Sequence, residues 1–148
     1  MNPKALSNLV DVCNTCIISC ERCLDAAEKC STSSSSNGCA SERSSFVSAA
    51  QDCIRDCEAC IKICDEMIIQ FKDKEMEEAH VEVLNRCVKA LGECIRICRD
   101  SADKCSREVD WKEACHDAQE ACEKAIQACD ECIESCEKHQ KSHNGSMG

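Results

Sequence analysis

Apolar residues recur along the chain at alternating intervals of three and four, separated by polar and charged residues. The pattern is clearest in residues 53–64, CIRDCEACIKIC, where cysteines take most of the apolar positions. This spacing is the a/d rhythm of a helix in a bundle, and it places the four thiols on one stripe. The residues between them are good helix formers, and the segment has no glycine or proline. It therefore predicts a helix whose core-facing stripe, called the seam below, carries sulfur in place of leucine.

The same seam recurs in four segments and predicts helices over approximately residues 3–30, 43–72, 74–106 and 111–141. Four helices of similar length with short connections predict an all-α fold, an antiparallel up-down four-helix bundle with a cysteine-lined core. We expect a single domain over residues 1–143. The seam residues, in chain order, are Leu6, Leu9, Cys13, Cys16, Cys20, Cys23, Ala27, Cys30, Phe46, Ala50, Cys53, Cys57, Cys60, Cys64, Met67, Phe71, His80, Leu84, Cys87, Leu91, Cys94, Cys98, Ser101, Cys105, Trp111, Cys115, Ala118, Cys122, Ala125, Cys129, Cys132, Cys136, His139 and His143.

Local signals set the helix boundaries. Residues 31–40 are rich in serine and predict a loop. The seam register slips near residues 72–74, which predicts a turn there with Asp73 as the N-cap; one continuous helix with a stutter is the alternative. Asp110 opens the fourth helix in a capping-box pattern. An Asn-Gly pair ends that helix and leaves a mobile tail over residues 144–148.

The composition shows that the core is largely thiol. The chain has 19 cysteines among its 148 residues, and only 2% of the residues are aromatic. A net charge of -10 argues against DNA, RNA or an anionic membrane as a partner. No apolar run approaches the roughly 18 residues that a membrane span needs. The N-terminal segment lacks the apolar core of a secretory signal, so we expect a cytoplasmic protein in a reducing compartment where thiols persist.

Thiols at these spacings suit a soft metal. Cysteines three or four residues apart on a helix have β-carbons about 5–6 Å apart, so their sulfurs can hold one small ion. Thiolate selects soft metals, and Cu(I) is foremost among those that a cell handles. An isolated Cu(I) dithiolate would bury a negative charge, whereas a bridged network with one Cu(I) per thiolate is neutral. We therefore predict many Cu(I) ions per chain, between about 9 and about 19. The candidate ligands are Cys13, Cys16, Cys20, Cys23, Cys30, Cys39, Cys53, Cys57, Cys60, Cys64, Cys87, Cys94, Cys98, Cys105, Cys115, Cys122, Cys129, Cys132 and Cys136, of which Cys39 lies off any seam.

Other chemistries of the thiols stay as alternatives. Zn(II) takes four tetrahedral ligands, which here would have to come from two helices at matched heights. A thiol redox or disulfide protein is a second alternative, although the cysteine count is odd and no cysteine is marked as the low-pKa member of a pair. Iron–sulfur ligation fits poorly, because the ferredoxin run wraps a loop around its cluster and is followed by proline. No nucleophile, base and orienting group stands apart from the repeat, so we expect no enzyme.

One end of the predicted bundle gathers nitrogen and thioether ligands. Antiparallel helices would bring Met67 and Phe71 beside His80 and His139. We predict that His80, His139 and Met67 are uptake ligands, through which copper passes to the thiols. A solvated helix end for the histidines and ordinary core filling for Met67 are the alternatives.

Together the seams, the Cys-Ile-x-x-Cys units (CIISC, CIRDC, CIKIC, CIRIC, CIESC) and the His/Met end resemble the bacterial copper storage proteins, in their cytosolic branch. The resemblance covers residues 6–143. It implies a four-helix bundle filled with Cu(I) held by cysteine thiolates, histidines at the open end, assembly as a homotetramer and a role in copper storage or detoxification. Copper ions are the expected partner, with donor and acceptor proteins that deliver and remove them. The chain departs from an all-cysteine seam at Leu91, Ser101, Ala118 and Ala125.

Overall fold

The computed structural model describes residues 3–32, 39–71 and 78–147, with side chains at all of these positions except 3, 39 and 141–147. Within these ranges the chain forms four α-helices and no β-strand. The helices are α1 (Pro3–Thr32), α2 (Cys39–Phe71), α3 (Glu78–Arg107) and α4 (Trp111–Met147). The prediction of an all-α fold with four helices is confirmed.

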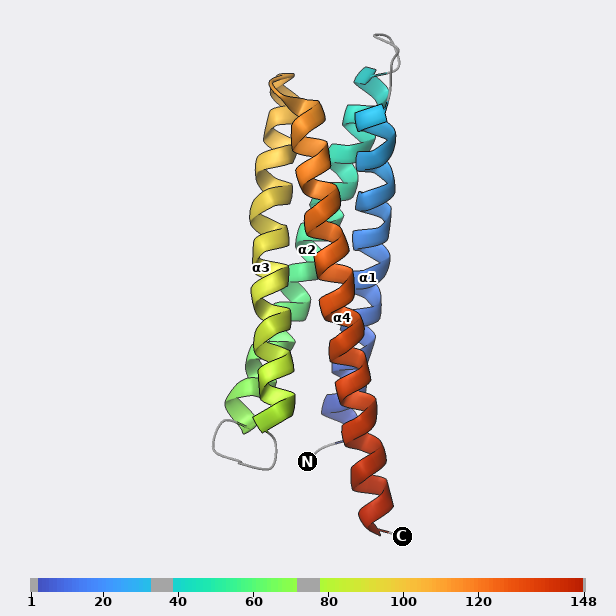
Figure 1. Ribbon diagram of the computed structural model, residues 1–148, viewed down its shortest axis with the longest axis vertical. Helices are drawn as coiled ribbons and strands as arrows, with labels where there is room; N and C mark the ends of the chain where they lie inside the picture. Colours follow the sequence, from blue (N-terminus) through green and yellow to red (C-terminus); the bar gives the residue numbers. More distant parts are fainter. Residues whose placement is uncertain (1–2, 33–38, 72–77, 148) are drawn as a thin grey trace.

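Each helix packs against two neighbours, so the four form a square in cross-section. α1 contacts α2 and α4, and α3 contacts the same two helices. Figure 1 shows that successive helices run in opposite directions along one long axis. α1 and α3 end where α2 and α4 begin, and α4 extends beyond the other helices at the opposite end. This arrangement brings all four seams to one central axis.

The helix bounds differ from the expected ones by a few residues. α1 continues to Thr32, whose hydroxyl donates to the carbonyl of Glu28 at 2.8 Å and so supports the last turn. α2 begins at Cys39, within the expected serine-rich loop, and α4 continues to Met147 through most of the expected tail. The expected cap Asp73 and the central part of the serine-rich loop lie outside the described residues. α2 and α3 are separate helices that pack against each other, which excludes one continuous helix across this region.

A tight backbone motif joins α3 to α4. The amide of Val109 donates to the carbonyl of Lys104 at 3.0 Å, and the amide of Glu108 donates to the carbonyl of Cys105 at 3.4 Å. These two bonds form a Schellman motif, with Glu108 at φ 60° in the position that glycine usually takes. Asp110 also has a positive φ, 47°, whereas a capping-box residue normally lies in the β region. The expected capping box therefore describes this turn poorly, although the helix does begin at residue 111.

The seam residues form the core. Every seam residue whose side chain is described is buried, except Trp111 and His139, which are half-buried. The flanking residues Val10, Ile17 and Leu24 are partly buried against the same core, which widens the apolar stripe of α1. Thiols behave as small hydrophobic groups in such a position, so the cysteines contribute to an apolar core.

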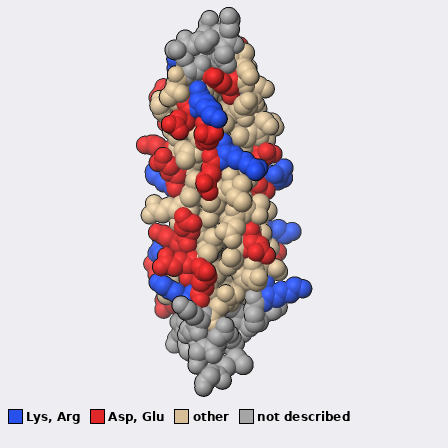
Figure 2. Space-filling view, turned by 90° about the vertical axis from the view of Figure 1, so that its right-hand side faces the viewer, with Lys and Arg blue, Asp and Glu red and all other residues tan. Residues whose placement is uncertain are grey.

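The outside of the bundle is charged. On the face drawn in Figure 2, acidic side chains are spread along the length of the molecule among fewer lysines and arginines. Most ion pairs join residues three or four apart on one helix, such as Lys29 and Asp25 at 3.1 Å, and such exposed pairs stabilise a fold only slightly. None of the described helices has a stretch long and apolar enough to cross a bilayer.

Candidate metal centre

A continuous column of sulfur occupies the middle of the bundle. All its cysteines are free and fully buried, with no exposed surface. We call the following set the thiol column: Cys13, Cys16, Cys20 and Cys23 of α1, Cys53, Cys57, Cys60 and Cys64 of α2, Cys87, Cys94 and Cys98 of α3, and Cys122, Cys129, Cys132 and Cys136 of α4.

The sulfurs of the column contact one another along and between helices. Three of the predicted pairs on one helix are in contact, as the Sγ atoms of Cys94 and Cys98 at 3.8 Å illustrate. Contacts between helices are as short or shorter. The Sγ–Sγ distances from α1 to α2 are 3.6 Å for Cys13 and Cys60, 3.5 Å for Cys16 and Cys57, and 3.5 Å for Cys20 and Cys53. With metal–thiolate bonds of about 2.3 Å, three sulfurs around one ion lie about 4 Å apart, so these spacings suit shared ions.

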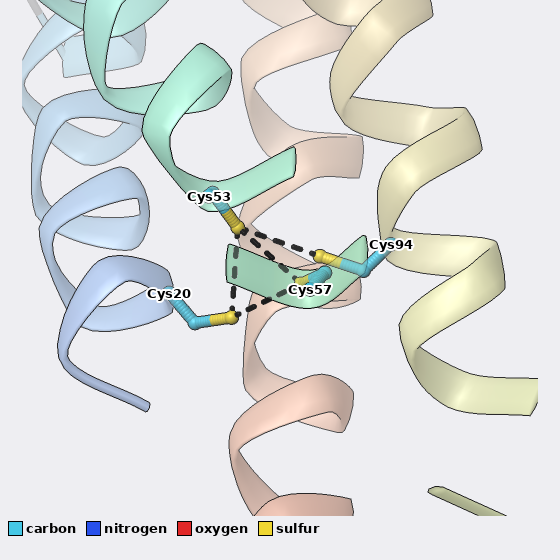
Figure 3. A group of neighbouring side chains, drawn as sticks. All are labelled: Cys20, Cys53, Cys57 and Cys94. Atoms are coloured by element: carbon cyan, nitrogen blue, oxygen red, sulfur yellow. Dashed lines mark hydrogen bonds between the residues drawn. The ribbon is translucent and has the colours of Figure 1, made fainter. Parts of the chain in front are cut away.

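Several thiols gather in groups that could each surround one ion. Figure 3 shows Cys20, Cys53, Cys57 and Cys94, from three helices, with their sulfurs pointing toward one another. The Sγ atoms of each such group lie within 4.8 Å of one another. The groups are Cys20/Cys53/Cys57/Cys94, Cys23/Cys53/Cys98/Cys122, Cys13/Cys60/Cys129, Cys60/Cys64/Cys87 and Cys30/Cys105/Cys115. Cys53 and Cys60 each belong to two groups, which permits bridging.

Protons are distributed unevenly over the column. The pKa of Cys57 is raised, because the thiols around it, Cys16 first, hydrogen bond with its protonated form and because burial disfavours the thiolate. The pKa of Cys53 is lowered, because the thiols of Cys122 and Cys20 donate hydrogen bonds to its thiolate. Each thiol that binds a metal ion must release its proton.

One end of the column carries nitrogen and thioether ligands. His80 is 5% exposed and Met67 is 3% exposed, and His80 Nε2 lies 3.4 Å from Met67 Sδ. His139 is half-buried and stacks on His80, with ring centroids 5.5 Å apart, and Phe71 lies against both rings. We call Met67, Phe71, His80 and His139 the histidine end; His143, the last of the predicted seam residues, lies outside the described side chains.

The chemistry of the histidine end depends on His80 staying neutral. Burial, with a smaller contribution from the charge of His139, lowers the pKa of His80 to about 4. Its Nδ1 lies 2.7 Å from the hydroxyl of Ser135. When Nδ1 carries the proton and donates to Ser135, Nε2 presents its lone pair beside the sulfur of Met67. A neutral nitrogen and a thioether can bind a soft metal ion and release it again.

The opposite end combines thiols with a charged side chain. Cys30, Cys105 and Cys115 have their Sγ atoms within 4.8 Å, and Cys105 and Cys115 are 3.7 Å apart. Arg43 donates from Nη1 to the carbonyl of Cys105 at 3.2 Å and pairs through Nη2 with Glu108 at 3.1 Å.

Aromatic residues pack beside this cluster. The Arg43 guanidinium lies 5.7 Å from the centre of the Trp111 ring, and Phe46 is fully buried. The pKa of Cys105 is lowered, first because the Cys115 thiol donates a hydrogen bond to its thiolate and also because of the charge of Arg43. We call this set the arginine end: Cys30, Arg43, Phe46, Cys105, Glu108, Cys115 and Trp111.

Comparison with known proteins gives one match. The model of the copper storage protein family matches residues 39–147, which is well over half of the chain. The chain belongs to the copper storage protein family. No curated protein and no solved structure matches it.

The family match and the thiol column overlap but do not coincide. Residues 39–147 include α2, α3 and α4, whereas α1 lies outside the match. Even so, Cys13, Cys16 and Cys20 of α1 make the shortest contacts of the column with α2. Four of the five thiol groups that could hold a metal ion therefore include a cysteine from a helix that the family model does not match.

The sequence pattern missed two residues at the ends of the column. Ser135 lies directly before Cys136 in the last Cys-Ile-x-x-Cys unit, and nothing in the spacing marks it as a partner of His80. Arg43 stands in a serine-rich segment before the seam of α2, and only the fold brings it to Cys105. Cys39, a predicted ligand, has no described side chain and stays a prediction.

Proposed function

We propose that this antiparallel bundle stores many Cu(I) ions as a bridged thiolate network inside the thiol column. The observation that carries the proposal is the run of buried free thiols with Sγ–Sγ distances of 3.5 to 4.0 Å, both along and between helices. Spacings of this size allow one thiolate to serve two ions. The role is non-enzymatic, and the cysteines act as ligands only.

The uniform burial of the thiols supports a monovalent ion. Among the described core residues no charged side chain is buried within the column to balance a net charge. Each Cu(I) carries one positive charge and each thiolate one negative charge. The loaded column is therefore neutral when it holds one ion per thiolate. The expected capacity is between about 9 and about 19 ions per chain.

An anaerobic titration of the reduced protein with Cu(I), against a competing chromogenic chelator, tests the proposal. We expect tight uptake of more than about 9 ions per chain, because shared thiolates hold more than one ion per pair. Copper should also raise the melting temperature, since the ions bind the folded column in preference to the unfolded chain. Uptake of only a few ions, or unchanged melting after loading, would contradict a buried store.

Zn(II) is a second candidate, because the fold does bring four thiols together. The groups Cys20/Cys53/Cys57/Cys94 and Cys23/Cys53/Cys98/Cys122 each offer four ligands, which meets the tetrahedral need of zinc. They share Cys53, so two separate zinc sites cannot form there. A parallel titration with Zn(II) distinguishes the two metals: saturation at one or two zinc ions that Cu(I) fails to displace would favour zinc.

A redox or disulfide role is tested by counting thiols in freshly isolated protein. The described cysteines are free, with closest sulfurs at 3.5 Å, well beyond a disulfide bond of about 2.05 Å. We expect nearly all thiols to react after unfolding. A large fraction of oxidised pairs would favour the redox role.

We further propose where copper enters and with what the chain assembles. Met67, His80 and His139 pass Cu(I) between a donor or acceptor protein and the column. The protein works in the cytoplasm, where thiols stay reduced, and as a homotetramer. Uptake that is unaffected by His80→Ala would contradict this route, and light scattering of the apo and loaded protein measures the assembly.

A further inference from the structure

The arginine end carries a thiol group that is cut off from the column. The nearest column group is Cys23/Cys53/Cys98/Cys122, and the end group is Cys30/Cys105/Cys115. On three helices the corresponding members are seven residues apart, which is about 10 Å along a helix. The two groups therefore occupy different levels of the bundle.

The level between the two groups contains no sulfur. Each helix contributes one buried seam residue to it, namely Ala27, Ala50, Ser101 and Ala118, with at most 1% of the side chain exposed. The hydroxyl of Ser101 is already used, since it donates to the carbonyl of Ala114 at 2.9 Å. A bridging thiolate links ions over two bonds of about 2.3 Å each, which is far less than 10 Å. Ions on the two sides of this layer therefore cannot share a thiolate.

A cation stands beside the isolated thiols. The side chain of Arg43 is 14% exposed and donates to the carbonyl of Cys105, while its partner Glu108 is 68% exposed and well hydrated. Water screens the Glu108 carboxylate more strongly than the protein interior screens the guanidinium. The lysines and arginines described beside the thiol column are all exposed, in contrast to Arg43.

We propose that Cys30, Cys105 and Cys115 form a separate site for one Cu(I), with Arg43 as the counter-ion, and that this site loads independently of the thiol column. The inference rests on the Cu(I) storage function proposed above. Each thiol of the group that binds the ion releases its proton, so the group keeps a net negative charge when it holds one Cu(I). The guanidinium offsets this charge. The column instead reaches neutrality by bridging.

Two matched variants test whether the end group binds its ion separately from the thiol column. In the full chain, Cys30→Ser/Cys105→Ser/Cys115→Ser removes the end group, and Cys20→Ser/Cys53→Ser/Cys94→Ser removes the same number of thiols from the column. We expect anaerobic Cu(I) titration to show a loss of about one ion for the first variant and of two or more for the second. Equal losses would overturn the separate site, because each thiol would then contribute alike.

Two charge variants test the counter-ion. Arg43→Gln should weaken the binding of the one end ion on the order of tenfold, and Glu108→Gln should tighten it several-fold, since it removes an opposing carboxylate. The affinity of the end site is obtained by subtracting two Cu(I) titration curves. One is that of the charge variant, and the other is that of the same variant with Cys30, Cys105 and Cys115 replaced by serine. A purely structural role of the Arg43–Glu108 pair would shift both in the same direction, and that result would overturn the proposal.

A gain-of-thiol variant keeps the proposal testable if the serine variants fail to fold. Ser101→Cys places sulfur in the empty layer and should make the end ion load together with the column, so that two separate phases of the titration become one. Two phases that persist in Ser101→Cys, or a single phase already in the wild-type chain, would overturn the inference. A wild-type chain that takes up only a few Cu(I) ions contradicts the storage function itself, a result distinct from all of these.

Discussion

The two ends of the bundle place different chemistry next to the same thiol column. At the histidine end the nearest ligands are neutral, because His80 is buried and lies beside the thioether of Met67. At the arginine end a guanidinium holds the carbonyl of Cys105 and pairs with Glu108 across the α3–α4 turn. A neutral end lets a cation approach and leave without charge repulsion, whereas a guanidinium near the path opposes its approach. This difference supports the proposal that copper for the column enters at the histidine end.

The ends also differ in how the chain closes them. The arginine end is bridged by the α3–α4 turn, Arg43 lies over Trp111, and Phe46 is fully buried. At the histidine end, Phe71 packs against two imidazole rings, and one of these, His139, is half-buried. The difference indicates that side chains at the arginine end have less room to rearrange than those at the histidine end. Measurements of unfolding free energy can test this.

The largest expected effect compares the two phenylalanines. Phe46→Ala should cost about 3–5 kcal/mol of unfolding free energy, because it leaves a cavity in a closed part of the core. Phe71→Ala should cost less, about 3 kcal/mol, since the imidazoles around it can shift toward the gap. Urea unfolding of the apo proteins measures both. A greater loss of unfolding free energy for Phe71→Ala would show that the histidine end is the more tightly packed of the two.

A second test uses the pH dependence of the histidine end. His80 has a pKa of about 4 in the folded protein and about 6.5 in the unfolded chain. Well above pH 6.5 neither state binds the proton, so stability is unaffected; as the pH falls through 6.5 toward 4, the unfolded chain binds the proton first and stability declines. The full decline is about 3 kcal/mol.

The control for this test is His80→Gln, which cannot titrate in this range. The difference in unfolding free energy between wild type and His80→Gln should change with pH between 6.5 and 4 and be constant above 6.5. Parallel pH profiles for the two proteins would show that His80 is accessible to protons in the folded state.

The sequence predicted which residues line the column and which gather at the histidine end, but not the contacts among them. Residues such as Cys57 and Cys98 face the core because a three-four spacing leaves a helix only one apolar stripe to bury. The spacing along one helix does not tell which residues of two helices lie at the same level of the bundle. The contact between Cys16 and Cys57 could therefore be seen only in the structure. The connection between the last two helices was predicted, but its Schellman geometry was not, because the left-handed residue Glu108 is not glycine, the usual signal.

Ser135 allows a finer test of the histidine end. Ser135→Ala removes the partner of His80 Nδ1 and should cost about 1–2 kcal/mol, because a buried nitrogen loses its hydrogen bond. Cu(I) uptake should slow a few-fold while the capacity stays the same, since His80 can then turn away from Met67. Stopped-flow uptake and urea unfolding measure the two effects. Ser135→Thr keeps the hydroxyl and should restore both; if it behaves like Ser135→Ala, the hydroxyl is not what positions His80.

The smallest expected effect concerns the turn that closes the arginine end. Glu108 holds φ 60° in a Schellman motif, a conformation that glycine adopts without the steric conflict of a β-carbon. Glu108→Gly should therefore raise the unfolding free energy by about 0.5–1 kcal/mol, reduced slightly by the loss of the exposed pair with Arg43. Glu108→Ala is the matched control, because it loses the same pair and keeps the β-carbon. The glycine variant should be the more stable of the two in thermal unfolding of the apo protein. If the two variants have the same melting temperature, the backbone of this turn is not strained. The packing of the arginine end then depends on Arg43, Phe46 and Trp111 alone.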